Sequence, residues 1–377
     1  MARVGDPPWR KAHSMKAHKG VSAILGTFAV LALVACSSTA PTEQPDGGGD
    51  AESWTPEYVD GVLQPLPDGF PNEQITLINP DVASHDDGLY ARAIQAALDG
   101  ISPVSIAVRD EGYPTFGTWA GIQTLTSEPG GNEGYLMLIT ALTGSGMDLL
   151  TEPITDEFGL TLDDLNPVIA TEQTPFVLMT RSDAPWDSYE EMVETAKANP
   201  GTLRYMAAVG SQLDIAMTRL QSEGGWDAQK IPAGGSDEAG TIVAAGEGDV
   251  TVLTPSVARA HLESGRGKVL LIVSSEMEAP EGYPDAVTTA AIGLPDEPWG
   301  STRGFVASPE IPELHKEWLF ELIRAASEQP VYAERLAQLP GSFAILLDGD
   351  EARTAIANAV DFAEPIIREL GLHYEQN

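Results

Sequence analysis

The chain has 377 residues, with 56 acidic and 21 basic side chains and a formal net charge of −35 at pH 7. This length allows two domains of about 150 residues each. Such an acidic protein is a poor partner for nucleic acid or for anionic lipid headgroups, because both are bound through clusters of Lys and Arg. Cys36 is the only cysteine, which excludes an intramolecular disulfide and a Cys-rich zinc site.

Residues 1–36 have the pattern of a bacterial export signal. A basic segment precedes an apolar run of 15 residues, from Val21 to Ala35, which is shorter than the roughly 20 residues of a transmembrane helix. The run ends in Leu-Val-Ala-Cys, which resembles the lipobox of bacterial lipoproteins, where the cysteine is acylated and becomes the mature N-terminus. We therefore predict a lipoprotein signal peptide over 1–36, a lipid anchor at Cys36, and a flexible tether with an N-terminal extension over 37–69. The alternative is a plain secretory signal with an incidental cysteine.

From Phe70 onward the pattern alternates between strands and helices. An apolar run at 75–78 predicts a strand, and a polar loop over 79–88 leads into a helix that ends at Leu98. Ligands of α/β sheets bind at the carboxyl ends of the strands, so this loop is a candidate ligand loop. We predict further strands at 104–108, 135–139, 165–170 and 176–180, a helix through Leu125, and a glycine-containing loop at 144–146.

A second alternating block follows Asp187. Asp187, Ser188 and Glu191 predict the capping box of a helix that ends at Ala198. We predict strands at 203–207, 250–253, 269–273 and 304–307, one helix over 213–222 and another that ends at residue 245. The segments 209–211, 230–236 and 254–256 are predicted loops. A helical tail follows, with helices over 314–326 and 351–370. Two successive α/β blocks predict two lobes with a cleft between them.

The sequence lacks the common catalytic motifs, including the phosphate-binding loop, His-Glu-x-x-His and Gly-x-Ser-x-Gly. His85 is the only histidine in a candidate ligand loop. With Asp86 and Asp87 it is a candidate for a weak metal site or for a hydrolase, but three adjacent residues cannot all converge on one ion, and no activated nucleophile accompanies them. We therefore predict no catalytic residue, no metal and no cofactor.

Several short motifs resemble the substrate-binding receptors of tripartite tricarboxylate transporters, and their order and spacing carry the resemblance. They are LDDLNPVIA at 162–170, ANPGTL at 198–203, the Gly210-Ser211 turn, IPAGGS at 231–236, GDV at 248–250 and WGSTRGFVA at 299–307. The resemblance spans roughly 70–372. It implies an α/β fold of the two-lobed periplasmic-binding-protein (flytrap) type, with two mixed α/β sandwich domains, a hinge and a ligand cleft. We predict lobe 1 over 70–172 plus 304–377 and lobe 2 over 173–303.

The resemblance also implies a function. The protein would be an extracytoplasmic, monomeric solute-binding receptor that captures a small organic carboxylate and delivers it to the membrane permease subunits of a tripartite transporter. A ligand sensor for a membrane signalling partner is the alternative, and a secreted hydrolase is a weaker one. Loop and helix N-terminal N–H groups would bind the carboxylate oxygens. We predict ligand contacts from Ala83, Ser84, His85, Asp86, Asp87, Arg109, Tyr113 and Thr115 in lobe 1, and from Gly210, Ser211, Gly234, Gly235, Ser236, Thr254 and Ser256 in lobe 2. The alternative roles are turns for the glycines and helix N-caps for Ser and Thr.

The first ligand loop departs from the family pattern GG-x-x-D-x-x-AR. Acidic residues Asp86 and Asp87 occupy this loop, and Arg109 stands where the family carries a neutral amide. Two acids beside one arginine predict a preference for a monocarboxylate or a zwitterion over a tricarboxylate. In this hypothesis Arg109 binds the ligand carboxylate or pairs with Asp86 or Asp87. The alternative is that both aspartates cap the following helix and face away from the cleft.

Overall fold

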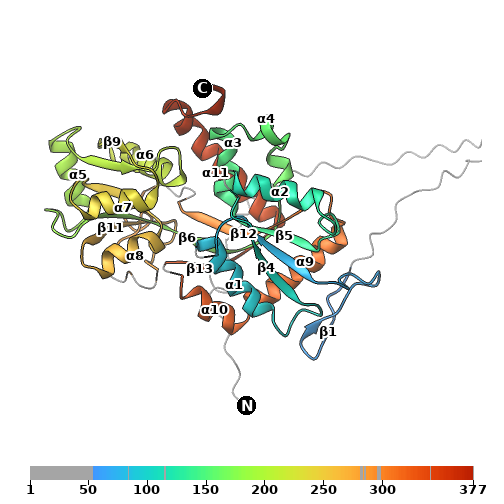
Figure 1. The fold of residues 1–377 in the computed structure, drawn as a ribbon. Coiled ribbons are helices and arrows are strands. Elements are labelled where there is room, and N and C mark those ends of the chain that lie inside the picture. Colours follow the sequence, from blue (N-terminus) through green and yellow to red (C-terminus); the bar gives the residue numbers. More distant parts are fainter. Residues whose placement is uncertain are drawn as a thin grey trace, which may run out of the picture. The chain divides into compact units, whose positions relative to one another are not determined.

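The computed structural model describes residues 54–376, except for 84, 114, 115, 281, 282, 284, 285, 295–298 and 340. The predicted signal peptide and the anchor at Cys36 lie outside the described residues. The described chain contains two large sheets with helices on both faces and a small N-terminal hairpin (Figure 1). Within this part of the chain, no helix is both long and apolar enough to cross a membrane.

The first sheet has six strands in the order β13-β6-β12-β5-β3-β4. β3 pairs in parallel with both β4 and β5, whereas β12 and β13 are antiparallel to their neighbours. The strands are β3 (Ile75–Asn79), β4 (Ile106–Asp110), β5 (Leu136–Ala141), β6 (Asn166–Thr174), β12 (Ser301–Ala307) and β13 (Phe343–Asp348), and the hairpin is β1 (Tyr58–Val59) with β2 (Val62–Leu63).

Helices pack on both faces of the first sheet because its central strands are apolar on both sides. On one face, Ile78, Leu138 and Val306 form a core with Trp119 of α2 and Ile356 of α11. On the other face, α1 contacts α9 and α10. The helices are α1 (Asp86–Leu98), α2 (Gly117–Ser127), α3 (Leu142–Thr151), α4 (Ile154–Phe158), α9 (Glu313–Ser327), α10 (Pro330–Leu336) and α11 (Gly349–Glu369), with 3₁₀ turns at Leu162–Asp164 and Tyr374–Gln376.

The second sheet has five strands in the order β11-β7-β10-β8-β9. Met217 of α6 and Met192 of α5 belong to the core on one face, and Val243 of α7 belongs to the core on the other. The strands are β7 (Phe176–Arg181), β8 (Arg204–Ala207), β9 (Gln229–Pro232), β10 (Val250–Leu253) and β11 (Gly267–Val273), and the helices are α5 (Tyr189–Ala198), α6 (Gln212–Gly224), α7 (Ser236–Ala244) and α8 (Pro255–Glu263).

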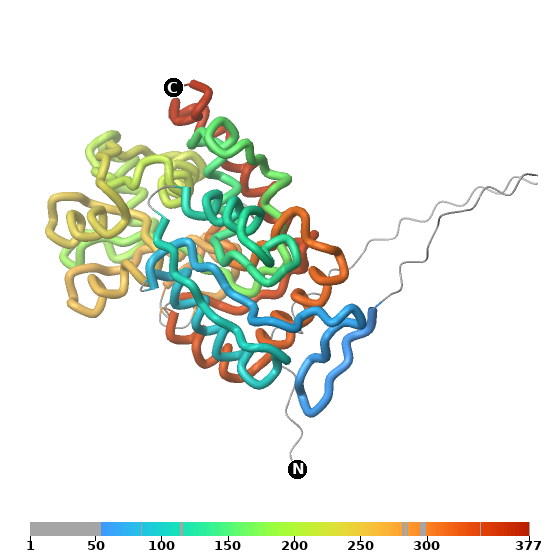
Figure 2. The backbone as a smooth tube through the Cα atoms, turned by 45° about the vertical axis from the view of Figure 1, so that its right-hand side comes forward, coloured from blue at the N-terminus to red at the C-terminus, as the bar shows by residue number. Residues whose placement is uncertain are grey.

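The chain passes between the two sheets twice, which Figure 2 lets the reader follow by colour. β6 ends at Thr174 and β7 begins at Phe176, so the first passage is a single residue long. The chain returns to the first sheet at β12, which pairs with β6 in antiparallel register. The two connecting strands therefore lie side by side, and side chains on them are close to both sheets.

The predicted mixed α/β class is confirmed, but four local predictions are wrong. The predicted loop at 144–146 lies inside α3. A Cβ at Gly146 would lie 2.7 Å from Ile356 Cγ2, and one at Gly144 would lie 2.1 Å from Gln212 Nε2, so these glycines allow close packing instead of a turn. The predicted loops at 230–236 and 254–256 contain β9 and the start of α8, and the predicted helical tail contains the edge strand β13.

Candidate functional site

An open cavity of about 400 Å³, here called the α2–α3 cavity, lies where β3 and β5 end and α2 and α3 begin. This is the edge at which α/β sheets bind ligands. The cavity is polar, with three carboxylates and several hydroxyl groups at its border. It is lined by Pro80, Asp81, Asp87, Tyr113, Phe116, Gly117, Thr118, Thr140, Ala141, Gly144, Ser145 and Asp148.

The first turns of α2 and α3 present backbone N–H groups at this cavity. Neither N-cap residue, Phe116 for α2 or Ala141 for α3, accepts a capping hydrogen bond through its side chain. Neither first turn contains an acidic residue. Because the first N–H groups of a helix have no intrahelical partner and the dipole is positive there, this edge of the cavity favours a negatively charged group.

Three hydroxyl groups join α2, β5 and α3 below these turns. Thr118 Oγ1 lies 2.5 Å from Thr140 Oγ1 and 2.8 Å from Ser145 Oγ, and the last two atoms are 2.9 Å apart. Ser145 also donates to the carbonyl of Ala141 at 3.0 Å. All three side chains are buried, and their mutual hydrogen bonds hold the two helix N-termini in a defined position.

Asp148 is the acid of the cavity that has no partner among the described residues. It lies on α3, seven residues after Ala141, four after Gly144 and three after Ser145. Residues at these spacings share one face of a helix. Its carboxylate makes no hydrogen bond or ion pair with any residue that the structure describes. Burial, and secondly the nearby charge of Glu152, raise the pKa of Asp148 to about 7.

Asp87 belongs to a buried ionic cluster beside the cavity. Arg303 Nε lies 2.5 Å from Asp87 Oδ1, and Arg303 Nη1 lies 2.5 Å from Glu172 Oε2. Arg303 is 6% exposed and Glu172 is fully buried, and Thr174 donates to Glu172. Burial raises the pKa of Asp87 although Arg303 opposes the shift. Burial alone would lower the pKa of Arg303, but Glu172 and Asp87 raise it, so the guanidinium stays charged.

Two contacts bring the second sheet to the same place. Ser256 Oγ, in the first turn of α8, donates to Asp86 Oδ2 at 3.0 Å, and Thr254 Oγ1 lies 2.9 Å from Ser256 Oγ. Gln212, the first residue of α6, packs against Gly144 at the cavity. The N-termini of α8 and α6 therefore approach the N-termini of α1 and α3.

The loops at the N-termini of α6 and α7 are held by local hydrogen bonds. Ser211 caps α6, since its Oγ accepts from Asp214 N, and it also donates to the Ala208 carbonyl at 2.6 Å. Asp214 is buried, accepts from Gly210 N at 3.0 Å, and pairs with Lys230 Nζ at 2.7 Å. The predicted alternative of a cap role is thus realised for Ser211.

The predicted ligand residues of the second sheet lie at helix N-termini, but their surroundings differ. Gly234 N donates to Glu238, and Gly235 is the N-cap of α7, whose first residue is Ser236. Among the described residues, no hydrogen bond or ion pair joins these three to the first sheet. Ser256 contacts Asp86 directly, and Thr254 is linked to Asp86 through Ser256. The hydrogen bonds that Gly210 and Ser211 make with described residues are local, and it is the next residue, Gln212, that packs against Gly144.

Apart from Arg109, the predicted residues of the first sheet divide into three groups. Asp87 and Tyr113 line the cavity. Ala83, His85 and Asp86 lie in the segment before or at the start of α1, where His85 Nδ1 lies 2.6 Å from Asp81 Oδ2. Ser84 and Thr115 are outside the described residues.

The predicted pairing of Arg109 with Asp86 or Asp87 is wrong. Arg109 pairs with Glu111 at 2.5 Å and with Glu128 at 2.8 Å. It is the register partner of Ile78, so both side chains are on the face of the sheet that α2 covers, and Glu128 is at the end of α2. Asp87 instead meets Arg303, and Asp86 meets Ser256. Both aspartates lie in the first turn of α1, whose N-cap is His85, so the alternative of capping is wrong too.

Sequence reasoning missed several residues of the site. They are Thr118, Thr140, Ser145, Asp148, Glu172 and Arg303. A charged residue within the buried strand 301–307 was a usable signal for Arg303, because an unpaired charge is not tolerated there. Asp148 was hidden because the sequence at 144–146 was interpreted as a loop, which removes the helical spacing that places it in the cavity.

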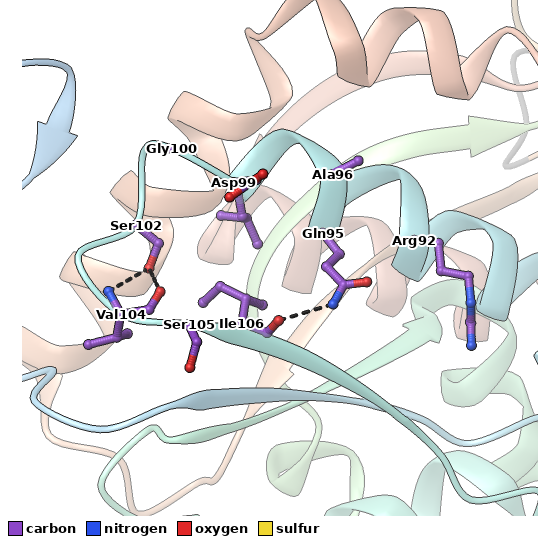
Figure 3. A pocket seen from close by; sticks show the side chains of 10 residues that line it. Arg92, Gln95, Ala96, Asp99, Gly100, Ser102, Val104, Ser105 and Ile106 are labelled. Atoms are coloured by element: carbon purple, nitrogen blue, oxygen red, sulfur yellow. Dashed lines mark hydrogen bonds between the residues drawn. The ribbon is translucent and has the colours of Figure 1, made fainter.

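A second hollow of about 320 Å³ lies between the end of α1 and β4 (Figure 3). Two of its polar side chains are already paired, since Gln95 Nε2 donates to the Ile106 carbonyl at 3.0 Å and Ser102 Oγ donates to the Val104 carbonyl at 2.8 Å. It lies at the carbonyl end of a helix, which disfavours anions. The α2–α3 cavity is therefore the better candidate. Among the described residues, no group of three or more His, Cys, Asp and Glu side chains is arranged to hold a metal ion.

Comparison with known proteins gives the family. Residues 111–372 match the sequence profile described as "Tripartite tricarboxylate transporter family receptor". A UPF0065 protein of Bordetella pertussis is 26% identical over 306 residues, which cover 81% of this chain and 92% of the relative.

Solved structures have the same fold. A TctC solute-binding protein from Polaromonas superposes with a TM-score of 0.64 at 19% identity, covering 80% of this chain and 99% of that protein. MatC from Rhodopseudomonas palustris, solved with bound malate, superposes with a TM-score of 0.57 at 22% identity, covering 78% and 100%. The predicted two-lobed periplasmic-binding-protein fold is confirmed. The chain therefore belongs to the tripartite tricarboxylate transporter receptor family, whose members are extracytoplasmic solute-binding receptors and not enzymes.

Proposed function

We propose that this receptor binds a small organic carboxylate in the α2–α3 cavity. The observation that carries the proposal is the pair of helix N-termini at Phe116 and Ala141, which have no side-chain cap and no acidic residue in the first turn. The N–H groups of a helix's first turn have no intrahelical partner, so they suit carboxylate oxygens and need no charged side chain. The bound malate of MatC is in keeping with a carboxylate ligand.

The second lobe, proposed as 173–303, would close on the ligand held by the first lobe, 70–172 plus 304–377. The hydrogen bond from Ser256 to Asp86 and the packing of Gln212 on Gly144 support this arrangement. Closure of two lobes around a bound solute is a hinge motion in which a few connecting residues change conformation. The short passage at 174–176 and the neighbouring strands β6 and β12 are suitable hinge elements. Gly210, Ser211, Gly234, Gly235, Ser236 and Thr254 would add contacts on closure.

The sequence of residues 33–36 supports a lipid anchor at Cys36, from which the receptor would deliver its ligand to membrane permease subunits. We expect the mature chain to begin at a diacylated Cys36, and Cys36→Ala to leave the precursor uncleaved or release it from the membrane. Intact-mass measurement of detergent-extracted protein checks this prediction. An unmodified Cys36 thiol, or cleavage elsewhere, would show that the anchor is wrongly assigned.

Calorimetric titration with malate, lactate, aspartate, alanine and citrate tests the carboxylate proposal. We expect at least one to bind and to raise the melting temperature in proportion to ln(1 + [L]/Kd). Ser256→Ala removes a hydrogen bond to a charged acceptor worth about 1–2 kcal/mol, so affinity should fall about fivefold to thirtyfold.

Ser222→Ala is the matched control for this titration, because Ser222 is exposed in the last turn of α6 and its hydroxyl makes no hydrogen bond with a described residue. It should leave the affinity unchanged. If no carboxylate binds, the proposed function is wrong. If one binds but Ser256→Ala binds it as tightly as Ser222→Ala does, the proposed contribution of α8 to ligand affinity is wrong.

A further inference from the structure

The first part of the chain that the structure describes, residues 54–70, is here called the N-terminal strap. It contains the β1–β2 hairpin (Figure 1) and packs against α9. Tyr58 Oη donates to Glu321 Oε1 at 2.7 Å, and Trp318 Nε1 donates to the Gln64 carbonyl at 2.9 Å. Three apolar side chains of the strap are buried, namely Leu63, Leu66 and Phe70.

The imidazole of His315, on α9, joins the C-terminal end of the strap to the rest of the domain. Its Nδ1 lies 2.7 Å from the Glu133 carbonyl oxygen, and its Nε2 lies 3.0 Å from Asp68 Oδ2. The ring also stacks on Phe70, with ring centroids 3.9 Å apart and planes inclined by 10°. Phe70 N in turn donates to Asp68 Oδ1 at 3.0 Å. One side chain therefore holds together the strap, the segment before β5 and α9.

Both nitrogens of the His315 ring face oxygen atoms that only accept hydrogen bonds. The Glu133 carbonyl has no proton to donate. The hydrogen bond from His315, and secondly the one from Phe70 N, lower the pKa of Asp68, so this carboxyl is ionised near neutral pH and also acts as an acceptor. A neutral imidazole carries one N–H group, whereas an imidazolium carries two. Only the protonated ring makes both contacts, and its stacking on an aromatic face suits a cation.

Other titratable side chains lie on the elements around the ring but do not bond to it. They are Glu73 after the strap, Glu133 and Tyr135 before β5, and Glu310, Glu313, Lys316 and Glu317 in or just before α9. Lys316 Nζ donates to Asn166 Oδ1 at 2.7 Å, and the Tyr135 hydroxyl donates to Asn72 Oδ1 at 3.1 Å. Among the described side chains, Asp68 is thus the ionisable group that pairs with the ring.

We propose that His315 is a pH-sensitive clasp of the N-terminal strap, closed while its ring is protonated and loosened when the ring loses a proton. An ordinary histidine loses this proton near pH 6.5. Above that pH one ring nitrogen presents a lone pair to an acceptor oxygen about 3 Å away, and that contact is lost. The stabilisation of the strap is therefore present at lower pH and disappears as the pH rises.

The clasp lies at the edge of the first sheet opposite to the α2–α3 cavity. The strap leads toward the start of β3, and Glu133 precedes the start of β5, whereas the cavity lies where these two strands end. A change at His315 therefore acts on the link between the strap and the domain and not on the cavity. A loosened strap gives the domain more freedom relative to the anchor proposed at Cys36, and only this consequence rests on that proposal.

Hydrogen exchange of the full chain, measured by mass spectrometry at about pH 5.5 and pH 8.5, tests the clasp. After correction for the intrinsic effect of pH on exchange, the protection of the segment 64–72 should fall about tenfold at the higher pH, because a charge-assisted hydrogen bond is lost. Asp68→Asn should reduce this difference to about threefold or less. The amide of Asn can donate to the lone pair of a neutral ring and can still accept from Phe70 N.

Asp60→Asn is the matched control, because it removes an exposed acid from the hairpin turn of the same strap and Asn also adopts the left-handed φ of 52° found there. It should keep the wild-type dependence on pH. Nitrogen NMR of the wild-type His315 ring is a second measurement that needs no variant, and it should show two N–H groups at about pH 5.5 and one at about pH 8.5.

Three results would overturn the inference: equal protection of the wild-type segment at both pH values, a ring with the same number of N–H groups at both, or a pH dependence that persists in Asp68→Asn. Loss of the dependence in Asp60→Asn would overturn it too, because the effect would then come from the total charge of the strap. None of these results bears on the carboxylate or the anchor, which are tested by titration and by intact mass.

Discussion

Arg303→Met should lower the free energy of unfolding by about 3–5 kcal/mol, the range seen when one partner of a buried ion pair is removed. Arg303 is the common partner of Asp87 and Glu172, at 2.5 Å from each. Methionine fills a similar volume but leaves both carboxylates without a counter-charge, and Glu172 is fully buried. Urea unfolding, monitored by circular dichroism, measures the change. The comparison requires that the m-value, the slope of the unfolding free energy against urea concentration, is the same for both proteins.

Arg259→Met is the matched control for this experiment. Arg259 pairs with Glu263 one turn along α8, and both side chains are more than half exposed. Such a pair contributes at most about 0.5 kcal/mol, so the control should unfold almost as the wild type does. Adding Glu172→Leu to Arg303→Met should recover part of the lost unfolding free energy, because it removes the more deeply buried of the two carboxylates left without a counter-charge. A loss below about 1 kcal/mol in Arg303→Met would contradict the buried cluster described here.

Asp148→Asn should make the ligand-free protein more stable above neutral pH. Burial raises the pKa of Asp148 from its ordinary value of 3.8 to about 7, so the native state holds this proton more tightly than the unfolded chain does. Its contribution to stability is therefore fully present below about pH 4 and is lost as the pH rises through about 7. At about 1.4 kcal/mol per pKa unit, the loss is at most about 4 kcal/mol.

The measurement is the difference in unfolding free energy between Asp148→Asn and the wild type as a function of pH. The difference should be smallest near pH 4 and should grow in favour of the variant up to about pH 8. Asp163→Asn, at an exposed position, should show a nearly constant difference over the same range. A difference for Asp148→Asn that does not change with pH would mean that its carboxyl titrates as an exposed aspartate does.

Most strands and helices were predictable because their signals are local. The apolar run at 75–78 and the helical spacing up to Leu98 correspond to β3 and α1. Ser188 caps α5 as its sequence predicted, with Glu191 N donating to its hydroxyl. In each of these cases a residue's neighbours along the chain supply the interaction that decides its conformation.

The wrong predictions concern elements whose partners lie far away in the chain. Gly144 and Gly146 belong to a helix because Gln212 and Ile356 pack against them. The residues near position 144 in the sequence do not predict either contact. β13 is a strand because β6 pairs with it, across more than 160 residues. An edge strand gains much of its stability from such a partner, so its own composition is a weak signal.

The sequence by itself determined the alternation of strands and helices, the family and the class of function, because periodicity, caps and short motifs are encoded by neighbouring residues. Only the tertiary structure decided which charges of the site are free. In the sequence, Arg109, Asp86 and Asp87 look equally able to bind a ligand, and Asp148 gives no sign of belonging to the site. Their roles differ because Glu128, Ser256 and Arg303 occupy the first three, while Asp148 has no such partner among the described residues. The strength of a charge in a folded protein depends on the distance to other charges and on burial, and both are properties of the packed chain.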